Sequence, residues 1–179
     1  MKNIHHFPSV RRDKSLSELI REIKRNSLFE KKEDRELISP STFVKMQQKI
    51  ENDINNILLQ REYIDSDYFL CGKYIAKMIS ETAQNPPESW YAIDYFSQMK
   101  SEEDYIPLKK AGDICFLISS VFTKRANHGL MKPSYYTVMG KNFYYLYYER
   151  GKREIGYLMS IKYKTMSQIT EEVTRPLFE

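Results

Sequence analysis

The sequence predicts an all-α single domain, a helical bundle of about six helices, from three observations. Only 6 Gly and 7 Pro occur in 179 residues, so few positions break a helix. Apolar residues recur at the period of an amphipathic helix along most of the chain. Helix start signals precede several of these segments. The length suits one domain with a sizeable core better than two.

Residues 1–36 are predicted to stand apart from the bundle, which we expect over residues 37–179. The first residues, 1–14, are basic and show no period, which is typical of an arm. Ser15 and Glu18 then form a capping box, in which both side chains accept backbone N–H groups at a helix start. We expect a short amphipathic helix over residues 16–29, followed by a charged link over residues 30–36.

Two long helices are predicted next. Ser39 as the cap and Pro40 at the first helical position start a helix that keeps one apolar face to about residue 61. Asp65-Ser66-Asp67 caps the following helix, whose apolar stripe is broader, so we expect it to be more buried. Pro86 and Pro87 end this helix because neither residue can continue it.

The next segments are predicted to reach the centre of the bundle. Between Trp90 and Met99, large rings fall at mixed spacing in a short segment. The helix that Pro107 opens is apolar on most sides, which is typical of a helix in the middle of a bundle. Its small residues recur at three and four positions and would let another helix approach closely. They are Ala111, Gly112, Cys115 and Ser119.

Two further helices complete the expected fold. The first carries the tyrosine-rich segment from Tyr135 to Tyr147 and contains Gly140, which costs about 1 kcal/mol relative to Ala in mid-helix. We expect Gly140 to pack against the small residues around Cys115. The last helix runs from about residue 154 to residue 173, and Pro176 ends it.

Asp113 is an acid inside the apolar central helix, and it has two interpretations. Near the helix start, its charge is favoured by the helix dipole and by free backbone N–H groups, which makes Asp113 a structural cap. Alternatively, it is a buried acid that holds an Arg or a Tyr from another segment. A buried carboxylate without a partner is too costly for a core, so both interpretations give it one.

The loop after the central helix carries the candidate binding residues. Basic, amide and imidazole side chains concentrate there and together can bind an anion or a partner. They are Lys124, Arg125, Asn127, His128 and Lys132. The alternative is a plain connecting loop that turns at Gly129. Convergence of Asp113, Arg125 and His128 would let the imidazole act as a general base, so an enzyme of unknown class at residues 124–132 is a third hypothesis.

The residue types present restrict which classes of protein and of binding site the chain can belong to. Cys71 and Cys115 lie inside apolar patterns, so we expect reduced core residues. No apolar run approaches the ~18 residues of a membrane-spanning helix, and a cytoplasmic location is the default expectation. The sequence has no Gly-rich phosphate loop, nucleophile elbow or Cys/His metal spacing, so we expect neither a cofactor nor a metal.

Part of the chain resembles a group of small uncharacterised bacterial proteins. The shared residues fall within about residues 108–145. They are Gly112-Asp113, residues 116–119, Phe122, Tyr135-Tyr136, Met139-Gly140 and Tyr144. The chain departs from the group at Ser120 and Val121, where the group has a small residue and an aromatic one. The resemblance implies a bacterial helical protein in which the Gly-Asp and Met-Gly positions are structural. It implies no catalytic residue.

The leading functional hypothesis is a non-enzymatic interaction protein, a regulatory or accessory subunit of a larger assembly. It would bind a protein partner or another copy of itself, because exposed amphipathic helices are present without reaction chemistry. The net charge of +4 permits an alternative, a nucleic-acid-binding accessory protein. That protein would use the basic arm, the loop at residues 124–132 and the tyrosine-rich and basic surface near the C-terminus.

Overall fold

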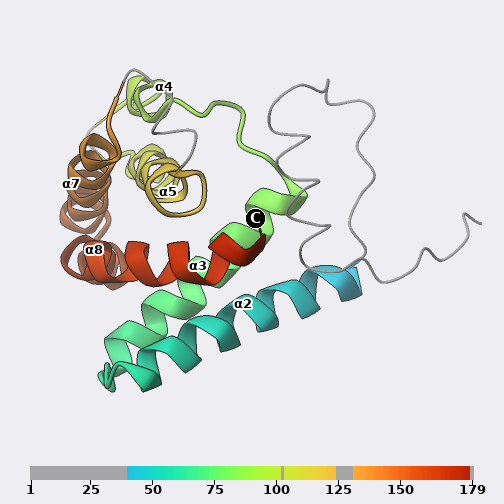
Figure 1. The fold of residues 1–179 in the computed structure, drawn as a ribbon. Helices are drawn as coiled ribbons and strands as arrows, with labels where there is room; N and C mark the ends of the chain where they lie inside the picture. Colours follow the sequence, from blue (N-terminus) through green and yellow to red (C-terminus); the bar gives the residue numbers. More distant parts are fainter. Residues whose placement is uncertain (1–39, 102, 124–130, 178–179) are drawn as a thin grey trace, which may run out of the picture.

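The computed structural model describes residues 40–101, 103–123 and 131–177. Within these ranges the chain forms six α-helices and a final 3₁₀ turn (Figure 1). They are α2 (Pro40–Gln60), α3 (Ser66–Gln84), α4 (Ala92–Ser97), α5 (Ile106–Ser120), α7 (Pro133–Gly151), α8 (Glu154–Thr174) and η2 (Arg175–Leu177). The prediction of an all-α single-domain bundle is confirmed. The predicted arm, amphipathic helix and charged link at residues 1–36 lie outside the described residues.

The local signals in the sequence account for the helix ends. Asp65 caps α3, and its side chain accepts the backbone N–H of Asp67 at 3.1 Å. Proline occupies the first turn of both α5 and α7, where its missing N–H costs nothing. α8 ends at Thr174, within one residue of the predicted end, and Pro176 lies within the 3₁₀ turn η2 that follows.

The helices form two packed groups that share α5 and α7. In Figure 1, α2 and α3 form an antiparallel hairpin, and α8 lies across both of them. α5 packs against α4, α7 and α8. One hydrophobic cluster joins α2, α3 and α8 to Phe116 of α5 and Tyr144 of α7. A second cluster joins α4, α5 and α7 around Leu108, Cys115 and Phe143.

The central position predicted for α5 agrees with its burial, since most of its residues are buried. Its small residue Gly112 admits a neighbouring ring: a Cβ at this position would lie 3.1 Å from Tyr144 of α7. The predicted neighbour of Gly140 is wrong. A Cβ on Gly140 would overlap the phenol ring of Tyr163 on α8, rather than meet the small residues around Cys115. The glycine in α7 thus makes room for a tyrosine of the last helix.

Both cysteines lie in the core. Cys71 and Cys115 are buried free thiols, as the apolar patterns around them predicted. Burial raises the pKa of each thiol to about 12, because the thiolate would lose its hydration. No helix in the described ranges combines the length and the apolar character needed to cross a membrane.

Candidate functional site

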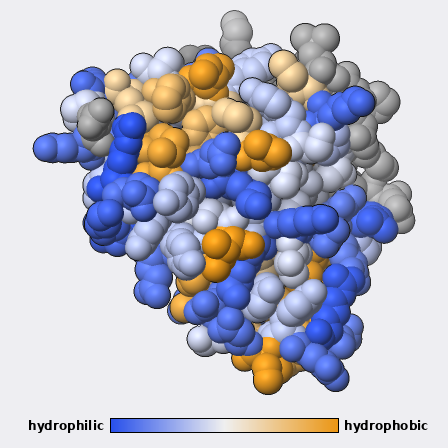
Figure 2. Space-filling view, turned by 90° about the vertical axis from the view of Figure 1, so that its left-hand side faces the viewer, coloured by the Kyte–Doolittle hydropathy of each residue, from blue (hydrophilic) through white to orange (hydrophobic). Residues whose placement is uncertain are grey.

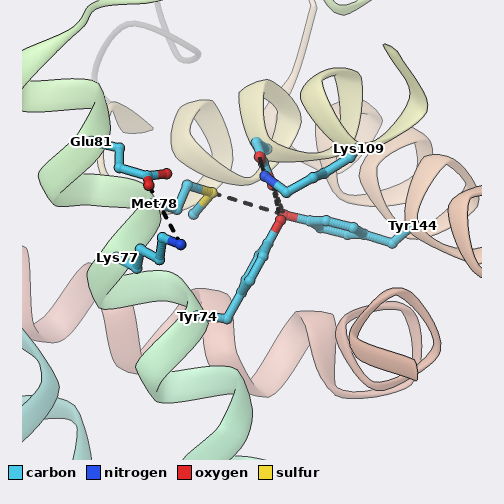
Figure 3. A network of polar contacts seen from close by, with 7 residues as sticks. Tyr74, Lys77, Met78, Glu81, Lys109 and Tyr144 are labelled. Carbon is cyan, nitrogen blue, oxygen red and sulfur yellow. Dashed lines mark hydrogen bonds and ion pairs between the residues drawn. The ribbon is translucent and has the colours of Figure 1, made fainter. Parts of the chain in front are cut away.

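Asp113 is the centre of a polar cluster that joins three helices (Figure 3). Its Oδ1 accepts hydrogen bonds from the hydroxyl of Tyr74 on α3 and, at 2.7 Å, from the hydroxyl of Tyr144 on α7. Its Oδ2 accepts a hydrogen bond from Nζ of Lys109, one turn earlier on α5, at 2.7 Å. The side chain of Asp113 is only 14% exposed and that of Lys109 is 30% exposed. The carboxylate therefore ties α3, α5 and α7 together.

Burial and charge set the protonation of this cluster. Burial raises the pKa of Tyr74 and of Tyr144 well above the usual value for tyrosine, and the charge of Asp113 raises both further. For Lys109, burial lowers the pKa, but the charge and hydrogen bond of Asp113 outweigh it, so the pKa is raised. At neutral pH the tyrosines are thus neutral donors and Lys109 is a cation. These three donors offset the desolvation of the carboxylate.

Ring contacts hold the donors of the cluster in place. Nζ of Lys109 lies 5.2 Å from the centroid of the Tyr74 ring, within reach of a cation–π interaction. The rings of Tyr74 and Tyr144 meet edge to face with centroids 6.2 Å apart. The hydroxyl of Tyr144 also lies 3.9 Å from the sulfur of Met78 (Figure 3). Each tyrosine is therefore fixed by its ring as well as by its hydroxyl.

The contacts of Asp113 are not those of a helix cap. Asp113 lies two turns inside α5, which begins at Ile106, so the free N–H groups of the first turn are not its partners. The alternative interpretation, an acid that holds a tyrosine from another segment, fits the contacts with Tyr74 and Tyr144. The sequence did offer one signal for the third partner, because Lys109 precedes Asp113 by four residues.

A pocket of about 320 Å³ opens beside the cluster. Its walls comprise the C-terminal end of α3, the turn at Pro86 and Pro87, Tyr95 of α4, and Lys109 and Asp113 of α5. Its lining also includes the apolar residues Met78, Ile114 and Leu117. Small-molecule sites have volumes of this order and combine apolar walls with a few polar groups.

The turn that forms one wall of the pocket is anchored to α4. The hydroxyl of Tyr95 accepts the backbone N–H of Ser89 at 3.1 Å and donates to the carbonyl of Ser89 at 3.1 Å. The hydroxyl of Ser89 donates to the carboxylate of Asp94. Because Tyr95 is buried, these hydrogen bonds fix the turn to the short helix α4.

An apolar surface lies on the outer side of α4. Ile93 and Phe96 stand one turn apart on this helix and are 61% and 41% exposed; we call these two residues the α4 patch. The ring of Phe96 lies 6.0 Å from that of Phe143 on α7, centroid to centroid. Figure 2 shows apolar residues gathered along the upper part of one face of the molecule. The lower part of that face is mainly hydrophilic.

The end of α7 and the start of α8 carry tyrosines beside the basic residues of the loop that joins them. The rings of Tyr148 on α7 and Tyr157 on α8 lie 5.3 Å apart, centroid to centroid. Nζ of Lys152 lies 5.7 Å from the centroid of the Tyr148 ring. Tyr145 and Tyr157 are exposed. We call Tyr145, Tyr148, Lys152 and Tyr157 the tyrosine–lysine surface.

Most of the predicted loop site lies outside the described residues. Four of its residues are outside the described ranges: Lys124, Arg125, Asn127 and His128. The convergence of Arg125 and His128 with Asp113 therefore stays a prediction. Lys132 is described; it is exposed and precedes α7 as its N-cap residue. The anion-binding loop and the enzyme hypothesis built on it therefore stay predictions.

Neither a metal site among the described residues nor a match to a known protein suggests a further functional site. Among the residues that the structure describes, no group of three or more His, Cys, Asp and Glu side chains is placed to hold a metal ion. In comparisons with protein-family models, curated proteins and solved structures, no match to this chain is found. A functional proposal must therefore rest on the contacts and surfaces of the chain itself.

Proposed function

We propose that the chain is a non-enzymatic interaction protein, a regulatory or accessory subunit that binds a protein partner through the α4 patch. The exposed pair Ile93 and Phe96 carries the proposal. Scattered apolar residues are ordinary on protein surfaces, but apolar side chains gathered on one face mark interaction sites. Large apolar side chains of this kind supply much of the energy of protein interfaces when a partner covers them.

The cluster around Asp113 supports the same proposal. Both oxygens of the carboxylate accept hydrogen bonds from side chains of the protein. A general base needs an oxygen within reach of the proton it abstracts. A carboxylate with both oxygens engaged is suited to joining helices, so the most polar part of the core has a structural role.

The experiment compares a patch variant with a matched control. The double variant Ile93→Glu/Phe96→Ser removes the apolar surface, and Ile161→Glu alters an exposed apolar residue on α8 outside the patch. Full-length proteins would be tested for self-association by light scattering after size-exclusion chromatography. They would also serve as bait for capture of a partner, identified by mass spectrometry and titrated against each variant.

The patch variant should weaken the association at least about tenfold, because buried apolar anchors commonly contribute more than about 1.4 kcal/mol. The Ile161→Glu control should bind as the wild type does. Circular dichroism checks that both variants fold. A wild-type protein that is monomeric and retains no partner, or equal losses in the two variants, would count against the proposal.

A second candidate function is nucleic-acid binding through the tyrosine–lysine surface. The neighbouring, tilted rings of Tyr148 and Tyr157, with Lys152 beside them, favour it. Bases stack on exposed aromatic rings, and basic side chains bind phosphates in a salt-dependent manner. Fluorescence anisotropy with single- and double-stranded oligonucleotides should show binding that falls steeply with salt. Tyr157→Ala should weaken it, and the absence of binding at low salt would end this hypothesis.

A further inference from the structure

Two prolines favour hydrogen-bond acceptors at one end of the pocket beside Asp113. In a continuing helix, the carbonyls of Thr82 and Ala83 would accept the N–H groups of the residues four positions later. Those residues are Pro86 and Pro87, which have no N–H. The last N–H at this helix end, that of Asn85, is bonded to the carbonyl of Glu81 at 2.7 Å. The end of α3 therefore offers carbonyl acceptors.

Further acceptors and negative charge lie at the same end of the pocket. Thr82, Glu81 and Glu88 all line it. Glu81 forms a long ion pair with Lys77, at 3.7 Å between exposed groups, and its charge also acts on Lys109. The C-terminal end of a helix also carries a partial negative charge. This side of the pocket therefore favours a cation that can donate hydrogen bonds.

The cationic side chains of the pocket are already engaged. Nζ of Lys109 donates to Asp113 at 2.7 Å. Nζ of Lys110 lies 5.9 Å from the centroid of the Tyr95 ring. These contacts direct the two lysines toward protein groups, whereas Thr82 and Glu88 line the pocket end just described. This end of the pocket thus needs hydrogen-bond donors from a ligand.

We propose that this pocket binds a small ligand that carries a primary ammonium group on a short apolar stem. The three donors of an ammonium match the carbonyl of Thr82 and the carboxylates of Glu81 and Glu88. The stem would lie against Met78, Ile114 and Leu117, which are apolar residues of the pocket lining. The site is separate from the α4 patch and does not depend on the proposed partner binding.

The test is a titration of the full-length protein, followed by amide NMR, with n-butylamine hydrochloride as the probe. Sodium butyrate, which has a similar stem and the opposite charge, is the control ligand. We expect n-butylamine to shift the amide signals of residues 81–89 and 109–117, and butyrate to leave them in place. Equal shifts with both compounds, or shifts only outside these residues, would overturn the proposal.

A pair of matched variants tests the role of the two acids. Glu81→Gln/Glu88→Gln removes both carboxylates while keeping the size of the side chains, and should weaken n-butylamine binding about fivefold, as expected for exposed charge pairs. Glu103→Gln/Glu154→Gln changes two exposed acids outside the pocket and should leave the affinity unchanged. An unaltered affinity in the first variant, or equal losses in both, would contradict the assignment.

Discussion

At the scale of single residues, Asp113 ties three helices of the core together. Its carboxylate receives three donors, and two of them come from residues 31 and 39 positions away in the chain. Tyr144, one of these donors, also covers Gly112 beside it. The Gly-Asp pair in α5 thus has one clear physical meaning. The glycine admits the tyrosine ring, and the aspartate binds the tyrosine hydroxyl.

Replacing Asp113 with Ala should lower the free energy of unfolding by about 2–4 kcal/mol, because the hydroxyls of Tyr74 and Tyr144 and the ammonium of Lys109 lose their acceptor. Urea denaturation at neutral pH measures the change. The triple variant Asp113→Ala/Tyr74→Phe/Tyr144→Phe should recover part of the loss, since the unpaired hydroxyls are gone. Asp53→Ala, which breaks an exposed pair with Lys49, should cost less than about 1 kcal/mol. Equal effects of Asp113→Ala and Asp53→Ala would refute the structural role.

At the scale of elements, α4 depends on its neighbours. It spans six residues, which is too short for a helix to be stable alone. Tyr95 anchors it, because the ring lies in the second hydrophobic cluster and the hydroxyl bonds to Ser89. The outer side of the same helix presents the α4 patch. One buried residue therefore holds both the exposed patch and the wall of the pocket.

Tyr95→Phe should loosen α4 and the preceding turn while leaving α5 intact. The variant loses both hydrogen bonds with Ser89, so we expect a stability loss of about 1 kcal/mol. Hydrogen–deuterium exchange measured by mass spectrometry should become faster over residues 88–97. Tyr91→Phe, which removes the hydroxyl of an exposed ring at the start of α4, is the control. Unchanged exchange over residues 88–97 in Tyr95→Phe would show that the anchor is unnecessary.

At the scale of the whole molecule, the core contains many weak acids that are held neutral. Burial raises the pKa of Tyr74, Tyr144 and Tyr163 well above the usual value of 10.0. Burial likewise raises the pKa of Cys71 and Cys115 from 9.0 to about 12. In the folded protein these groups keep their protons at a pH where the unfolded chain would lose them. Deprotonation of these groups therefore favours the unfolded chain.

The free energy of unfolding should therefore fall as the pH rises above about 9. There the unfolded state binds fewer protons than the folded state, so the slope of stability against pH is negative. The thiols act first, from the usual pKa of 9.0, and the tyrosines steepen the fall above 10.0. Urea denaturation between pH 7 and about pH 11 measures the profile. In Cys71→Ala/Cys115→Ala the fall should begin nearer pH 10; stability that stays level to pH 11 would contradict the prediction.

The sequence by itself determined the class of the fold, the places where most helices begin and end, and the faces that are buried. These features follow from the spacing of apolar residues and from caps such as Asp65, which act within a few residues along the chain. The contact between Lys109 and Asp113 also follows from local spacing, because residues four apart on a helix are neighbours.

Only the tertiary structure decided which side chains meet. The choice of Tyr74 and Tyr144 as partners of Asp113, and of Tyr163 as the neighbour of Gly140, depends on how α3, α7 and α8 cross α5 and one another. The pocket and the α4 patch arise in the same way, from the packing of distant segments. Packing depends on the shapes of several helices together, so the spacing of apolar residues in one helix does not determine it.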